Sequence, residues 1–155
     1  MNTAAPEPSK GTTAAPEPSN ARALPVRAFE PDVDLAVFWS ATGEHRLLLP
    51  QCESCDGFIW YPRPYCPACG RIGVRWVEAS GRGRIYSFTI TRSSSGAWKG
   101  VVPYVLAYVE LDEGPRVLTN IVDCPVDEVR VGQRVRVVFE DAIEGTAAVY
   151  RFTPR

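Results

Sequence analysis

The chain has 155 residues, 45% of them hydrophobic, and its 17 lysines and arginines nearly balance 18 aspartates and glutamates to a formal charge of −1. This length accommodates one or two small globular units. The balanced charge argues against a protein that coats a polyanion, because phosphate-backbone binding needs a concentrated basic surface. No window reaches the roughly 18 consecutive apolar residues of a membrane span. The first residues also lack the pattern of a secretory signal, so we expect a soluble, cytoplasmic protein without a membrane partner.

Residues 1–28 have the composition of a disordered Pro/Ala-rich tail. The seven residues 3–9 recur unchanged at 13–19, and the segment contains five of the 14 prolines and no aromatic residue. Such a segment cannot bury enough apolar surface to offset the entropy of ordering the chain. We expect a flexible spacer, with a short partner-binding motif as the alternative, and a folded part that begins near Phe29.

Residues 29–50 predict a helical arm. Apolar residues recur at helical spacing from Asp32, and Gly43 is a suitable end for the helix. More than half of its circumference is apolar, so a helix this short must pack on its own chain or on another protein. In the second case the aromatic pair Phe38 and Trp39 is the candidate contact with the partner.

Residues 51–80 contain the most specific motif, a pair of CxxC sequences formed by Cys52, Cys55, Cys66 and Cys69. Two thiolates two residues apart can reach one ion from a tight turn, and two such turns supply the four-sulfur tetrahedral shell that zinc prefers. Expected strands at 46–51, 58–61 and 74–79 flank the pairs. The pattern predicts a rubredoxin-like zinc ribbon.

The expected zinc is one structural ion per chain, because sulfur occupies all four positions and leaves none for water or substrate. Disulfides between the same cysteines are the alternative. They are disfavoured because the chain shows no secretion signal.

Residues 81–155 predict a five-stranded OB-fold barrel, so that the protein as a whole is mainly β. A helical turn at 125–130 between the third and fourth strands matches the OB-fold order. Strands 103–111 and 116–123 are apolar enough to be central. The expected strands are 84–92, 103–111, 116–123, 133–140 and 147–152.

The loop 93–102 carries Trp98 and Lys99 at its centre, and OB-folds commonly bind ligands through this loop. Trp98 can stack on a purine and Lys99 can meet a phosphate, which suits the nucleotide end of acyl-CoA as well as single-stranded nucleic acid. The alternative is that Trp98 folds back over the barrel.

Taken together, these features resemble a known family, the zinc-ribbon and OB-fold proteins once catalogued as domain of unknown function thirty-five. The resemblance covers 29–155. The motifs that carry it are the Phe38-Trp39 helix, the two CxxC pairs, and the segments 62–64, 76–83, 103–105, 118–120 and 131–140.

The resemblance implies a small non-catalytic partner of a thiolase-like enzyme, such as a thiolase, an acyl-condensing enzyme or a retro-aldol lyase of sterol side-chain degradation. Some members associate with hydratases of the hot-dog fold. We therefore expect an accessory subunit that stabilises such an enzyme and helps form its acyl-CoA site.

The residues themselves agree with a non-catalytic role. The single histidine, His45, has no triad near it in sequence. A single-stranded nucleic-acid-binding module is the alternative function, although Arg82, Arg84, Arg92 and Lys99 are few and dispersed for a basic strip. A self-contained enzyme is the third choice.

Overall fold

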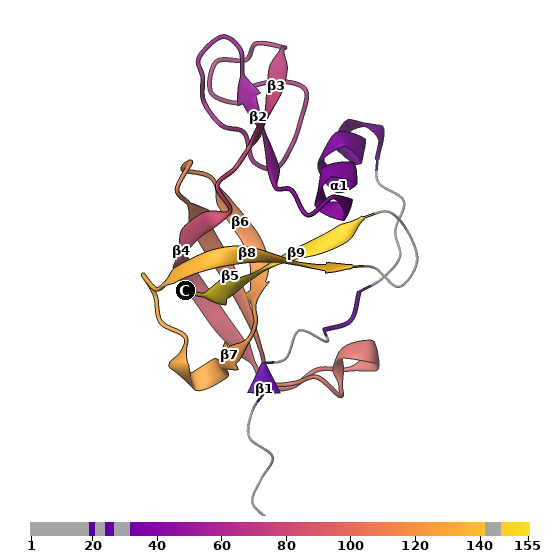
Figure 1. Ribbon diagram of the computed structural model, residues 1–155, viewed down its shortest axis with the longest axis vertical. Coiled ribbons are helices and arrows are strands. Elements are labelled where there is room, and N and C mark those ends of the chain that lie inside the picture. Colours follow the sequence, from indigo (N-terminus) through magenta and orange to yellow (C-terminus); the bar gives the residue numbers. More distant parts are fainter. Residues whose placement is uncertain (1–18, 21–23, 27–31, 142–146) are drawn as a thin grey trace, which may run out of the picture.

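The computed structural model describes residues 19–20, 24–26, 32–141 and 147–155 (Figure 1). The described part is mainly β, with one short α-helix, two small two-stranded sheets and a closed barrel; the sheet of β2 and β3 lies above the barrel in the orientation of Figure 1. This confirms the predicted fold class. Of the helices in the described part of the chain, none has the length and apolar character needed to cross a bilayer.

The predicted helix begins as a 3-10 turn, Val33–Leu35, and continues as α1, Ala36–Gly43. The helix ends at Gly43, as predicted, and His45, with φ 58°, adopts the left-handed conformation two residues later. The N–H groups of His45 and Arg46 donate to the carbonyls of Thr42 and Ala41, which satisfies the last turn of the helix.

The two-stranded sheet pairs β2, Leu48–Cys52, with β3, Val74–Glu78, in antiparallel register. The strand predicted at 58–61 is wrong, because this segment makes only a single bridge between Phe58 and Gln51. Pro62 and Pro64 follow it directly and have no N–H to donate, so the pairing cannot extend.

The barrel has five strands in the order β4-β5-β6-β9-β8 and closes between β8 and β4. A 3-10 turn, Val126–Glu128, separates the third and fourth strands, as predicted. The only parallel pairing among the barrel strands that the structure describes, Ile121 with Phe152, joins β6 to β9. The strands are β4 Arg82–Thr91, β5 Tyr104–Leu111, β6 Arg116–Ile121, β8 Arg134–Asp141 and β9 Ala148–Pro154.

Two glycines allow β4 to enter the barrel between its neighbours. A Cβ on Gly83 would lie 2.4 Å from the carbonyl oxygen of Glu110 on β5. A Cβ on Gly81, which has φ +67°, would lie 2.4 Å from Cγ1 of Val137 on β8. A side chain at either position would therefore push a neighbouring strand away.

One hydrophobic core joins the helix, the ribbon and the barrel. Phe38 of α1 and Leu49 of β2 are fully buried in the same cluster as the barrel residues Val109 and Phe152. The predicted parts 29–50, 51–80 and 81–155 therefore all contribute side chains to one core. β2 begins within the first of these parts.

The N-terminal segment differs from the predicted tail where the structure describes it. β1, Ser19–Asn20, pairs with β7, Cys124–Pro125. Leu24 is buried against the barrel, and its carbonyl accepts a hydrogen bond from the buried guanidinium of Arg151. A lone leucine among prolines produces no periodic pattern, so the composition did not indicate this contact. Most of residues 1–28 lies outside the described part.

Candidate metal centre

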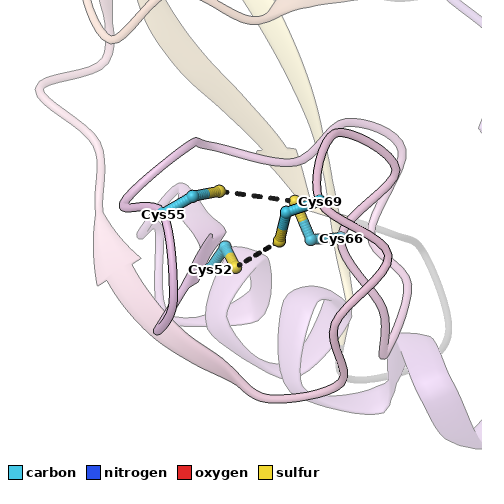
Figure 2. Close-up of side chains that lie close together, drawn as sticks. All are labelled: Cys52, Cys55, Cys66 and Cys69. Atoms are coloured by element: carbon cyan, nitrogen blue, oxygen red, sulfur yellow. Dashed lines mark hydrogen bonds between the residues drawn. The ribbon is translucent and has the colours of Figure 1, made fainter.

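The four predicted cysteines converge beside the end of the β2-β3 sheet at which Cys52 pairs with Val74. Figure 2 shows their sulfurs pointing toward one another from two loops. All four sulfurs lie within 4.8 Å of one another. The Sγ atoms of Cys52 and Cys69 are 3.7 Å apart, as are those of Cys55 and Cys66.

These distances fit a tetrahedral zinc site. Zinc binds sulfur at about 2.3 Å, so two ligands of a regular tetrahedron lie roughly 3.8 Å apart. A disulfide needs about 2.05 Å, and all four cysteines are free thiols. The donor set, four soft sulfurs with no oxygen or nitrogen ligand, is typical of a structural zinc ion.

Both CxxC pairs adopt the same local turn, which explains why the spacing works. In the first pair, the N–H of Asp56 donates to the carbonyl of Cys52, four residues earlier. In the second pair, the N–H of Gly70 donates in the same way to the carbonyl of Cys66. Asp56 and Gly70 have φ of 57° and 72°. In the first turn, therefore, an aspartate adopts the left-handed conformation that a glycine adopts in the second.

The electrostatics of the cluster also favour a cation. The N–H of Ser54 donates to the sulfur of Cys52 at 3.4 Å and is the main reason that the pKa of Cys52 falls to about 7. The N–H of Gly57 lowers the pKa of Cys55, but the neighbouring thiols, Cys52 first, outweigh it and raise that pKa to about 12. Adjacent thiolates repel one another, so full deprotonation requires a positive ion among them.

The four other predicted contact residues lie in two places. Phe38 is fully buried and Trp39 is half-buried, and their rings are in edge contact at 5.0 Å. The helix thus packs on its own chain, the first of the two alternatives, and Phe38 has no surface to offer a partner. Trp98 is half-buried, with its ring 4.8 Å from that of Tyr104 and packed against the buried cluster that contains Leu24, while Lys99 beside it is exposed.

The structure also gathers arginines that appear dispersed in the sequence. Strand pairing places Arg82 opposite Arg136 and Arg84 opposite Arg134. Arg92 is elsewhere, in an ion pair with Asp127 at 2.9 Å. The alternation of arginine with valine in β8 was visible in the sequence, but its register with β4 was not.

A rubredoxin-like zinc ribbon attached to a closed OB barrel is the class of protein that this fold and site define, and comparison with known families agrees. The model described as the rubredoxin-like zinc ribbon domain of ChsH2 matches residues 39–72. The model for the C-terminal OB-fold domain of ChsH2 matches residues 76–140. A DUF35 domain-containing scaffold protein of Methanothermobacter thermautotrophicus is 35% identical over 111 residues, 68% of this chain and 84% of the relative. The chain belongs to the DUF35 family, as the resemblance predicted.

Solved structures and longer relatives extend the comparison. A chain of the Ltp2-ChsH2(DUF35) aldolase superposes with a TM-score of 0.74 at 31% identity, over 82% of this chain and 98% of that chain. A DUF35 protein from Sulfolobus solfataricus shares the fold, with a TM-score of 0.57 at 16% identity. The 3-oxo-4,17-pregnadiene-20-carboxyl-CoA hydratase alpha subunit of Mycobacterium tuberculosis is 31% identical, but the match spans only 34% of that subunit and 70% of this chain.

Proposed function

We propose that this protein is a non-catalytic accessory subunit of a thiolase-like acyl-CoA enzyme, which it binds and stabilises and whose acyl-CoA site it helps form. The observation that carries the proposal is the similarity to the DUF35 chain of the Ltp2-ChsH2 aldolase, which extends over nearly all of that chain and both of its domains. The relatives named scaffold proteins support the same role.

The chemistry of the described residues supports an accessory role. The donor set of the metal centre fills a tetrahedral shell with sulfur, so a zinc ion there would organise the ribbon and would not activate water. The ring of His45 stacks on Phe139 at 5.3 Å, and its Nε2 lies 2.7 Å from Asp141. This histidine connects the end of the helix to β8, which is a structural task.

Two further contacts belong to the proposal. A hydratase of the hot-dog fold is a second partner, because the relatives include hydratase alpha subunits about three times as long as the matched region. Exposed Lys99 and the half-buried ring of Trp98 contact the nucleotide end of an acyl-CoA that the partner holds.

The alternative, binding of single-stranded nucleic acid, has one observation in its favour, the arginines gathered on β4 and β8. Most of these arginines already form ion pairs with carboxylates of the same chain. Asp112 forms ion pairs with both Arg82 and Arg134, and Glu110 pairs with Arg84. This arrangement suits a protein partner better than a phosphate backbone, which needs many unpaired cations.

Co-expression with the thiolase-like protein encoded nearest to this chain tests the proposal. We expect a complex that survives size-exclusion chromatography, and a higher unfolding temperature of the enzyme when this chain is present. A thiolase from the same organism encoded elsewhere is the control. If the chain binds neither protein but binds oligonucleotides with an affinity that falls steeply with salt, the alternative function is correct.

A further inference from the structure

The outward face of the sheet formed by β4, β5 and β6 exposes a set of large apolar side chains. Tyr86, Leu106, Tyr108 and Leu118 each leave between 36 and 48% of their surface in solvent. We call these four residues the apolar face. β5 and β6 are central strands, as predicted, each paired on both sides in the barrel, and strands of such apolar composition would be expected to bury both of their faces. The structure instead buries alternate residues and exposes those between them.

Strand register makes the apolar face continuous. Tyr108 pairs directly with Leu118 on one side and with Ser87 on the other. An irregularity in the pairing between Ile85 and Ser87 leaves the intervening Tyr86 exposed at the same edge. A groove of about 240 Å³ runs between these side chains and is lined by Ser87, Phe88, Thr89, Leu106, Ala107, Tyr108 and Leu118.

A row of exposed arginines borders the apolar face along β4, β6 and β8. We call this row the arginine rim. One of its guanidinium groups contacts the apolar face directly, since the central carbon of Arg116 lies 3.5 Å from the centre of the Tyr86 ring. The rim consists of Arg82, Arg84, Arg116, Arg134 and Arg136, all exposed.

The rim concentrates positive charge on a chain whose formal charge is −1. Two carboxylates, Glu110 and Asp112, lie among its five arginines, and Arg136 forms no ion pair with any described residue. Arg82 and Arg136 face each other across paired strands, an arrangement of like charges that destabilises a sheet. Carboxylates from outside the chain would relieve this repulsion.

We propose that the apolar face and the arginine rim together dock a partner protein whose contact surface is apolar at its centre and edged by aspartate and glutamate. This inference rests on the proposed function and names the surface through which it operates. Tyrosine and arginine are enriched at the energetic centres of protein interfaces, and the rim supplies charge complementarity with an acidic edge. The groove is smaller than the roughly 300 Å³ or more of small-molecule pockets, which favours a side chain of a protein over a separate ligand.

Binding measurements with the co-expressed thiolase-like enzyme test the proposal. The double variant Tyr108→Ala/Leu118→Ala should raise the Kd about tenfold or more, since it removes two adjacent interface side chains. Its matched control is Ile72→Ala on the ribbon, whose side chain is 85% exposed and whose loss should change the Kd less than about twofold.

Charge reversal tests the rim separately. Arg136→Glu places a carboxylate opposite Arg82, so the strand pairing should be retained while the rim loses positive charge. We expect slower association and a weaker dependence of the association rate on salt than in the wild type. Arg71→Glu makes the same change in charge on the ribbon and should leave the association rate and its dependence on salt unchanged. Circular dichroism and zinc content verify that every variant is folded.

The outcomes distinguish this proposal from the one on which it rests. If the wild type binds the enzyme and the face variants bind equally well, the docking surface is wrong and the accessory role stands. If the wild type does not bind, both proposals fail. If the face variants instead abolish binding of acetyl-CoA to the isolated chain, or convert a dimer of this chain to a monomer, the face has another occupant and the proposal is overturned.

Discussion

The zinc ribbon and the barrel are stabilised in different ways. The buried cluster that belongs to the ribbon alone consists of Cys52, Ile59 and Cys66, with half-buried Val74 against it. Two of its three buried members are candidate metal ligands. The barrel buries a much larger set of valine, isoleucine, leucine and phenylalanine side chains. We therefore expect metal binding to contribute more to the stability of the ribbon, and apolar burial to contribute more to that of the barrel.

An aromatic junction couples the two regions. Phe38 of α1 is in edge contact with Trp60 of the ribbon at 5.5 Å and with Tyr150 of β9 at 5.7 Å. Because these rings belong to three different parts of the chain, the regions are expected to differ in stability but to influence one another.

The largest effect is expected from Cys52→Ser. Metal content should fall from about one zinc per chain to below about 0.2, because folding and metal binding are coupled in small metal sites. Hydrogen exchange should show lost protection in β2 and β3, while β5 remains protected. Cys124→Ser, which changes a cysteine outside the metal cluster, is the control and should retain the zinc. Equal loss of protection in β2 and β5 would show that ribbon and barrel unfold as one unit.

A large but metal-independent effect is expected from Phe152→Ala. This side chain is fully buried in the barrel core, and its truncation should lower the free energy of unfolding by about 3–5 kcal/mol. Urea denaturation measures the loss, and the zinc content of the folded variant should be unchanged. The exposed Val131 provides the control, since Val131→Ala should change stability by less than about 0.5 kcal/mol. A loss of zinc in the Phe152 variant would contradict the separation of the two regions.

The smallest effect is expected from Tyr150→Phe at the junction. Burial, and secondarily Tyr61, raise the pKa of Tyr150, whose hydroxyl donates to the carbonyl of Leu118 at 3.2 Å. The unfolded state releases this proton near pH 10 and the folded state holds it to higher pH, so wild-type stability should fall as pH rises above about 10. The variant should lose about 1 kcal/mol at neutral pH and show a shallower alkaline fall.

Thermal unfolding between pH 7 and 11 measures this dependence. Tyr108→Phe removes an exposed hydroxyl and should leave the alkaline fall in place. If the Tyr150 and Tyr108 variants show the same pH dependence, the junction does not contribute to it.

Local patterns predicted the features that depend on neighbouring residues. The two CxxC pairs indicated the metal site because the geometry of each pair is set by a local turn. In these turns the N–H of Asp56 or Gly70 donates to the carbonyl of the first cysteine of the pair. Alternation along 84–92 and 133–140 indicated strands β4 and β8 for the same reason, since side chains on a strand point to opposite faces by turns. The segment 58–61 had suitable residues for a strand but no partner with which to extend.

The sequence by itself therefore determined the four cysteines of the candidate metal site, the succession of barrel strands along the chain and the family. Only the tertiary structure decided which residues meet across strands and between the parts of the chain. It buried Phe38 and Leu24, left Tyr108 and Leu118 in solvent, and set Arg82 opposite Arg136. These outcomes depend on strand register and on packing between segments far apart in sequence, and a one-residue shift in register would move each side chain to the other face.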